Sequence, residues 1–379
     1  MEKVGLLFLF WTIIFVVITM EDGKKYNLFI FISSFARNLV EIFSGVLLYK
    51  MGYSIKDIML FFGVVYFFSI FINVIVIKLD RVISSKSILI FSSLMFSISY
   101  YFFSKMSNSL SDLIIFGGLY SLASFSYHPV RHIYGIEASK GESRKIGNIV
   151  IFTYIGSMLS GILGGIIFSK FSLVWGAVFI FIISFMGIFC LRGFKESKCK
   201  SSRGKRVPDI EFNRILFFIL EQFKVAFFLM VPLYLYLNVD DSIMYIGYVN
   251  VLTVLSAIIF VYFFVKRDIM RLFPYFNILF VLVLLLKLNI SSKVMVLVVS
   301  FLEGFFLKMY EVCSTKNMYI VGNNDIYSYL TVVEIIFSIS RTFIFMLGFI
   351  MAISLKGFLY ISLVNIFISG FLLKKKSLS

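Results

Sequence analysis

The stretch GNIVIFTYIGSMLSGILGGIIF, residues 147–168, carries no charged side chain and is long enough to cross a membrane as one helix. About 18 consecutive apolar residues suffice to span the ~30 Å hydrocarbon layer of a bilayer. Comparable stretches recur along the whole chain, of which 60% is hydrophobic. We place twelve spans at residues 27–48, 55–77, 87–104, 110–132, 147–168, 171–191, 212–237, 244–265, 271–289, 293–313, 326–350 and 355–373. The sequence therefore predicts an all-α, polytopic membrane protein.

Lysine and arginine residues alternate between the connections of these spans. The even-numbered connections, with the segments before the first span and after the last, hold 25 of the 36 basic residues, and the odd-numbered connections hold seven, Lys287 among them. Because cytoplasmic loops carry the basic excess, both ends of the twelve-span core are predicted to face the cytoplasm of a cell membrane. Topology accounts for the net charge of +16, so no nucleic-acid partner is expected. The segment Arg192–Arg214 is suited to acidic lipid headgroups.

A polar segment divides the chain into two halves of six spans each. We expect an N-terminal bundle at 27–194, a basic cytoplasmic linker at 195–211, and a C-terminal bundle with a short basic tail at 212–379. Two such bundles predict a pseudo-symmetric transporter with its site between the halves. Residues 1–26 hold a further apolar segment with three open interpretations: a thirteenth span, an interfacial helix, or an extension before a true start at Met20.

Two short motifs carry a resemblance to a known family. The sequence VIKLDRVISSK at residues 76–86 is similar to the Gly-x-Leu-Ala-Asp-Arg loop signature of the major facilitator superfamily, matched at Asp80, Arg81 and the trailing Lys86. In the fifth span, SGILGG at residues 160–165 resembles the Gly-Pro-x-x-Gly-Gly element of its antiporters, without the proline. The layout of residues 27–375 also resembles that superfamily. The resemblance implies rocking of two bundles around a central cavity lined by spans one, four, seven and ten.

Seven charged residues lie near the middle of predicted spans, where each charge costs about 2.5–3.5 kcal/mol on insertion scales. Several share a helix face with serine, threonine or asparagine residues three or four positions away. A polar stripe on an apolar helix does not face lipid. We therefore expect a pathway for substrate and protons formed by Arg37, Glu41, Glu221, Lys224, Glu303, Glu334 and Arg341.

Two interpretations of these charges stay open. Arg37–Glu41 and Glu221–Lys224 have the spacing of ion pairs within one helix and can be purely structural. Alternatively, three bases and four acids leave one carboxylate without a counter-ion, and such a group can load and release a proton near neutral pH. Glu303 has no basic residue within one turn of its own helix. We therefore expect it to carry the proton, with Glu334 as the second candidate.

Other polar and small residues have simpler interpretations. Asp80 and Arg81 are expected to act in gating, through contacts made in one state and broken in the other. His128 and His132 lack a clear third metal ligand and are assigned to a polar cytoplasmic mouth, so we expect no metal and no cofactor. The glycines of the fifth span are expected to let helices pack closely. The three cysteines and the 48 phenylalanines receive no functional role.

These observations favour proton-coupled efflux of a small amphipathic organic solute, by antiport, through a monomer. Uptake or exchange of an organic anion held by Arg37 and Arg341 is an alternative. A second alternative is a receptor or immunity protein that is built on a transporter fold and transports nothing. The sequence shows no phosphate loop and no nucleophile–base arrangement, so an enzyme is not expected.

Overall fold

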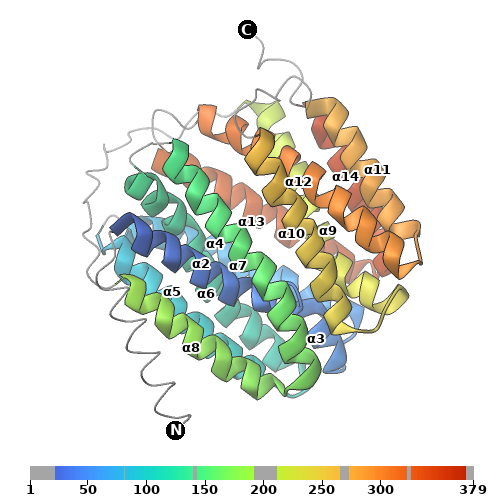
Figure 1. Cartoon of the computed structure of the whole chain (residues 1–379), viewed down its shortest axis with the longest axis horizontal. Coiled ribbons are helices and arrows are strands. Elements are labelled where there is room, and N and C mark those ends of the chain that lie inside the picture. Colours follow the sequence, from blue (N-terminus) through green and yellow to red (C-terminus); the bar gives the residue numbers. More distant parts are fainter. Residues whose placement is uncertain are drawn as a thin grey trace.

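The computed structural model describes residues 22–80, 82–139, 143–191, 211–264, 273–321 and 326–372, with the side chains of 22–23, 132–148, 150, 264, 313–328 and 330 outside that set. The elements in these ranges are helices (Figure 1). They are α2 (Asp22–Glu41), α3 (Ser44–Lys50), α4 (Ile55–Leu79), α5 (Ser85–Phe103), α6 (Leu110–Ser139), α7 (Ser143–Lys170), α8 (Leu173–Leu191), α9 (Phe212–Asn238), α10 (Ile243–Phe264), α11 (Phe273–Asn289), α12 (Lys293–Val321), α13 (Ile326–Ile350) and α14 (Leu355–Leu372). The pieces α2 and α3 together form the first span. The segment 1–20 and most of the predicted linker lie outside the described residues.

Apolar length explains why the chain forms these helices. Among the described residues, nine helices are long and apolar enough to cross a membrane, and α11 is a shorter apolar helix. Helices α6 and α12 reach 30 and 29 residues and exceed the predicted spans 110–132 and 293–313. At ~1.5 Å per residue each is roughly 45 Å long. Hydropathy marks only the part in hydrocarbon, whereas the helix continues through polar residues beyond it.

Successive spans run in opposite directions, so their connections gather at two ends. We call the end where α8 stops and α9 starts the linker end. The opposite end, the hairpin end, carries the short connections 51–54, 104–109, 171–172, 239–242, 290–292 and 351–354. Contacts at this end join neighbouring connections within each bundle: the Tyr53 hydroxyl donates to the Ser107 carbonyl at 2.7 Å, and Lys293 at the start of α12 pairs with Asp240 at 2.6 Å.

The bundles α2–α8 and α9–α14 meet along two long helix pairs, α4 with α13 and α7 with α10 (Figure 1). A Cβ on Gly161 of α7 would lie 2.7 Å from the amide nitrogen of Asn250, which itself donates to the Ser157 carbonyl at 3.1 Å. In the other pair, Asn73 donates to the Ser338 hydroxyl at 3.1 Å. The close packing expected of the fifth-span glycines is thereby confirmed at Gly161.

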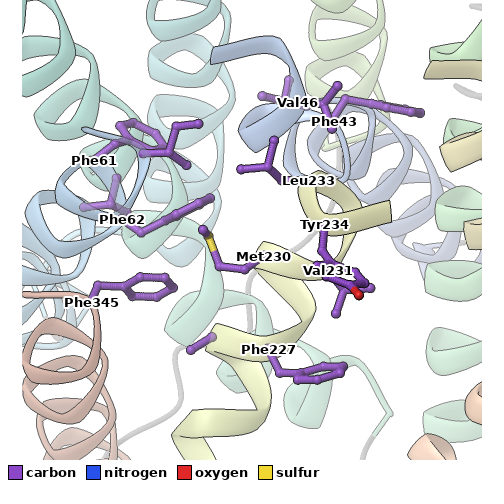
Figure 2. Packing of buried hydrophobic residues seen from close by; sticks show 14 of the residues in the cluster. Phe43, Val46, Phe61, Phe62, Phe227, Met230, Val231, Leu233, Tyr234 and Phe345 are labelled. Atoms are coloured by element: carbon purple, nitrogen blue, oxygen red, sulfur yellow. The ribbon is translucent and has the colours of Figure 1, made fainter. Parts of the chain in front are cut away.

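An apolar seal closes the space between the bundles near the hairpin end (Figure 2). The Phe62 and Phe345 rings, from opposite bundles, lie 5.1 Å apart. Met230 of α9 points toward these rings in Figure 2. The seal consists of Phe43, Val46, Phe61, Phe62, Met230, Leu233 and Phe345, all 3% exposed or less. Seven tightly packed apolar side chains exclude water, so the bundles are closed at this end.

The first span is broken at Ile42–Phe43, between α2 and α3. The Phe43 amide bonds to the Val40 carbonyl at 3.1 Å, one residue closer than in an α-helix, and the Ser44 hydroxyl donates to the Glu41 carbonyl at 3.0 Å. Interrupted backbone is tolerated at membrane depth where it is buried in protein or lines a cavity. The break makes Glu41 the last residue of α2, on the linker side of the seal.

Replacing Gly247 by alanine tests the close approach of α7 and α10. The new Cβ would run into the Gly161 carbonyl group, so the helices must separate. We expect the free energy of unfolding to fall by about 1–3 kcal/mol, measured by thermal unfolding of the purified protein. Gly118→Ala is the matched control, because its Cβ would lie 3.6 Å from the Phe68 ring, an ordinary contact. Equal stability of the two variants would contradict the packing.

Candidate functional site

A cavity of about 50 Å³ lies between the bundles. It sits on the linker side of the seal, with which it shares Phe62. Along α2, α4 and α9 its other residues, Glu41, Val65, Tyr66 and Leu229, come nearer the linker end than those of the seal. This volume holds a few water molecules and is far below the roughly 300–1,000 Å³ of ligand pockets. Its lining residues are Glu41, Phe62, Val65, Tyr66, Tyr120, Ser124, Phe125 and His128 of the N-terminal bundle, and Leu229 of the C-terminal bundle.

Glu41 is the acid that lines this cavity. No hydrogen bond or ion pair joins its carboxylate to another residue in the part of the chain that the structure describes. Its position at the end of α2, beside the break, directs it into the space between the bundles. The cavity therefore contains an acid whose charge no bonded base neutralises.

Arg37, one turn before Glu41, makes other contacts. Its guanidinium donates to the Ser92 hydroxyl at 2.6 Å and to the Ala123 carbonyl at 3.3 Å. It also lies 4.0 Å from the centre of the Tyr127 ring. The side chain is directed toward α5 and α6, and the helix-internal pair with Glu41 considered from the spacing is not formed.

The charges of α9 form the ion pair that was one of the two interpretations of their spacing, in place of the pathway role expected for Glu221 and Lys224. Lys224 Nζ lies 3.2 Å from the Glu221 carboxylate, and both side chains are about nine-tenths buried. The ammonium group also lies 4.8 Å from the centre of the Tyr310 ring. This pair is neutralised within its own helix, as the i,i+3 spacing indicates.

Arg341 lies next to the cavity wall. Its Nε donates to the Gln222 side chain at 2.8 Å, and its guanidinium lies 5.1 Å from the centre of the Tyr66 ring, which lines the cavity. Gln222 is a buried polar residue that the charge count did not consider. Glu334, two turns before Arg341, is partly buried, and its carboxylate forms no hydrogen bond or ion pair with another described residue.

Glu303 is not the unpaired carboxylate that the sequence predicted. Its side chain is 1% exposed and forms an ion pair and hydrogen bond with Lys287 of α11, whose side chain is 2% exposed. Lys287 had been assigned to a connection because it lies near the end of its span. A lysine stem is long enough to reach inward from such a position and place its ammonium group beside an acid on the next helix.

A second polar cluster connects the two bundles. Lys308 of α12 donates to the Tyr154 hydroxyl of α7 at 2.5 Å and pairs with Glu311 at 3.3 Å. Tyr154 in turn donates to the same Glu311 oxygen at 3.0 Å. Lys308 is one of the 25 bases counted with the even-numbered connections and the two ends. The sequence gave no role to Tyr154 or Glu311, because nothing within α7 or α12 shows that these residues face each other.

The predicted gating and histidine residues are placed only in part. Asp80 follows α4 at the linker end and accepts a hydrogen bond from the Ser85 hydroxyl at 2.6 Å. Arg81 and the side chain of His132 lie outside the described residues. His128 lines the cavity itself, deeper than the cytoplasmic mouth to which it had been assigned.

Comparison with known proteins identifies the fold. No protein-family model and no curated protein matches this sequence. Among solved structures, a crystal structure of a mutant of the nucleoside transporter NupG is similar, with a TM-score of 0.70, 10% sequence identity, and coverage of 93% of this chain and 99% of that one. The chain has the major facilitator fold. At this identity the likeness concerns the fold alone, and it confirms the architecture expected from the layout of the spans.

Aromatic rings are the functional feature that the sequence did not reveal. Bases inside the major facilitator bundle lie over ring faces, which attract cations through the negative potential of the π-system. The composition offered a signal in its 19% of aromatic residues, although the same content suits lipid contact equally well. The pairs are Arg37 with Tyr127 at 4.0 Å, Lys308 with Tyr154 at 4.5 Å, Lys224 with Tyr310 at 4.8 Å and Arg341 with Tyr66 at 5.1 Å, each to the ring centre.

A double-mutant cycle tests the Lys287–Glu303 pair. Glu303→Gln leaves a buried ammonium group without a counter-ion, so we expect it to lower the free energy of unfolding by about 3–5 kcal/mol. Lys287→Met should act similarly, and the double variant should lose clearly less than the sum of the two. Chemical denaturation of the purified protein measures all three.

The control cycle uses Lys293→Met and Asp240→Asn in the same bundle. Lys293 is 60% exposed in that ion pair, so the coupling energy should stay below about 1 kcal/mol. Additive losses at Lys287 and Glu303 would contradict the buried pair.

Proposed function

We propose that this protein is a proton-coupled secondary transporter that exports a small amphipathic organic solute in exchange for protons. The two bundles rock about the cavity and open it alternately to each end. The observation that supports this most directly is the carboxylate of Glu41 in the cavity, bonded to no base among the described residues. The basic residues of the connections favour a cytoplasmic linker end, and one chain suffices for the mechanism.

The two ends of the bundle differ in ways that suit alternating access. The hairpin end is closed by the apolar seal, in which rings pack directly on rings. Toward the linker end, the long side chains of Tyr154, Lys308 and Glu311 join α7 to α12. Such polar contacts can be exchanged for water when the bundles separate. We assign gating to this cluster and to Asp80 at the end of α4, and keep Arg81, the next residue in the sequence, as a predicted gating residue.

The chemistry of Glu41 suits a proton carrier. It faces a space with room for a few waters, so a proton can reach it without displacing a bonded partner. Glu303, in contrast, would have to break its buried pair with Lys287 before it could be protonated. Glu334 is the second candidate, since it also has no bonded base among the described residues, although it does not line the cavity.

The lining also bears on the solute. Three of the lining residues are phenylalanine or leucine and two are tyrosine, which suits a solute with apolar surface and a few polar groups. The guanidinium of Arg37 is already bonded to Ser92 and Ala123, so an organic-anion site based on Arg37 and Arg341 loses one of its two bases. The structural neighbour is described as a nucleoside transporter, which makes a nucleoside a reasonable solute to test.

Flux in proteoliposomes with an imposed pH gradient tests this function. Three solutes cover the charge classes: ethidium as a cation, uridine as a neutral nucleoside and p-aminohippurate as an anion. We expect the proton gradient to drive movement of at least one of them. Glu41→Gln cannot exchange a proton and should reduce that flux to the level of protein-free liposomes.

Two further variants identify the proton carrier. Glu41→Asp keeps a carboxylate and should retain gradient-driven flux, whereas Glu334→Gln should leave it largely intact. Full gradient-driven flux in the Glu41→Gln variant would contradict the assignment of Glu41. A protein that moves none of the solutes at either pH yet binds another protein tightly would support the alternative of a receptor or immunity protein.

A further inference from the structure

The cavity lining has the chemistry of a cation site. The rings of Phe62, Tyr120 and Phe125 line the cavity together with Glu41, and no lysine or arginine is among the lining residues that the structure describes. A carboxylate supplies negative charge, and ring faces attract cations at a distance of about 6 Å or less. Carboxylate and rings together favour a positively charged solute over a negative one.

The charged and titratable groups around Glu41 agree with this preference. They are Arg37 on α2, Tyr66 on α4, Tyr120, His128 and Arg131 on α6, and Arg341 on α13, with Leu229 facing the cavity from α9. Each arginine has another partner: Arg37 bonds to Ser92, Arg341 bonds to Gln222, and Arg131 lies 5.5 Å from the centre of the Tyr127 ring. Their charges moderate the field at Glu41, while none of the three forms an ion pair with it.

The chain's own cations show that its aromatic clusters can hold positive groups at membrane depth. Arg37 lies between Tyr127 and Phe96, at 4.0 and 4.9 Å from the two ring centres. Its charge is held by rings, a hydroxyl and a carbonyl, and no carboxylate of the described residues bonds to it. The cavity offers the same kind of rings with a carboxylate added, and its described lining includes no lysine or arginine.

We propose that the transported solute is an organic cation with aromatic or apolar surface, and that it competes with a proton for the carboxylate of Glu41. This inference rests on the proposed transport function and names the substrate class. The solute replaces the few waters of the cavity, pairs its charge with Glu41 and packs its apolar surface against Phe62, Tyr120 and Phe125. Because the closed cavity measures about 50 Å³, the bundles must separate to admit it.

Competition for one carboxylate explains how solute and proton flows are coupled. Glu41 is neutralised either by a proton or by the cation, and the two cannot occupy it together. A charged carboxylate with neither a proton nor a cation bound is costly in a closed cavity. The bundles therefore switch the cavity from one end to the other most readily when a proton or a cation is bound to Glu41. Each cycle then exchanges one proton for one positive charge.

Binding of two isosteric ions to the purified full-length protein tests the substrate class. Tetraphenylphosphonium and tetraphenylborate have nearly the same shape and apolar surface and carry opposite charges. Equilibrium dialysis with each labelled ion, at an acidic and at an alkaline pH, gives the affinities. We expect the phosphonium ion to bind and the borate ion not to bind, and the phosphonium affinity to fall by up to about tenfold per pH unit as protons occupy Glu41.

Variants assign the binding to Glu41. Glu41→Gln should lose phosphonium binding, while Glu41→Asp should keep it with the same direction of pH dependence. Glu211→Gln is the matched control, because it removes one carboxylate at the start of α9, far along that helix from Leu229, and should change nothing. Folding of each variant is checked by its elution as a single species from a sizing column.

Several outcomes would overturn the proposal: no phosphonium binding, or stronger binding of the borate ion than of the phosphonium ion. So would a phosphonium affinity that does not change with pH, or that is unchanged in the Glu41→Gln variant. The failure of the substrate class differs from the failure of the function. Proton-driven flux of uridine or p-aminohippurate without phosphonium binding would support the transport function and contradict the assignment of an organic cation as the solute. Phosphonium binding without proton-driven flux of any solute would support the cation site and contradict the proposed transport function.

Discussion

The structure depends on how positive charge is accommodated inside a membrane. A base in the hydrocarbon layer costs several kcal/mol unless it has a partner. This chain partners several of its buried bases with aromatic rings, serine hydroxyls, carbonyls and an amide. Arg37 shows the principle most fully, because two rings, Ser92 and the Ala123 carbonyl together replace a counter-ion. The same bonds tie α2 to α5 and α6, so charge compensation also holds the N-terminal bundle together.

This arrangement has a consequence for the acids. Since Arg37 and Arg341 are satisfied by rings and neutral groups, Glu41 and Glu334 are left without a bonded base among the described residues. Glu41 then lies at a break in the first span, in the cavity between bundles that an apolar seal closes at one end. A carboxylate in that position can respond to a proton or to a cationic solute. Because the arginines are stabilised by aromatic rings and neutral groups, the carboxylate of Glu41 remains available for a proton or a cationic solute.

Much of the fold could be predicted from the sequence, because the length of each apolar stretch and the alternation of basic connections can be read directly along the chain. The spans were placed closely enough to give two six-helix bundles. Spacing left ion pairs within a helix open at both Arg37–Glu41 and Glu221–Lys224, and only the second pair is formed. Contacts between side chains of different helices could not be predicted from the sequence. Glu303 was wrongly predicted to be unpaired, because its partner, Lys287, belongs to another helix and had been counted with a connection. Helical spacing shows which residues share a face and does not show which helix that face meets.

The aromatic residues illustrate the same limit for the candidate site. Tyr66, Tyr127 and Tyr154 hold cations, yet in the sequence they are indistinguishable from the many rings that face lipid. The intramembrane charges predict where polar chemistry is to be sought, and their place in a transport pathway stays a prediction. Their roles depended on neighbours such as Gln222 and Ser92, which carry no charge and therefore gave no signal. The glycines were more informative, since close helix packing is what their position in an apolar span most often means.

The most direct test of the account is infrared difference spectroscopy of the protein in lipid, recorded between an alkaline and an acidic pH. Protonation of a carboxylate in a low-dielectric site produces a carboxylic-acid C=O stretching band that is absent from the charged form. We expect this band to appear on acidification in the unmodified protein and to disappear in the Glu41→Gln variant, while Glu303→Gln retains it. A band that persists in Glu41→Gln and is lost in Glu303→Gln would contradict the central claim, because the buried Lys287–Glu303 pair would then be the group that exchanges protons.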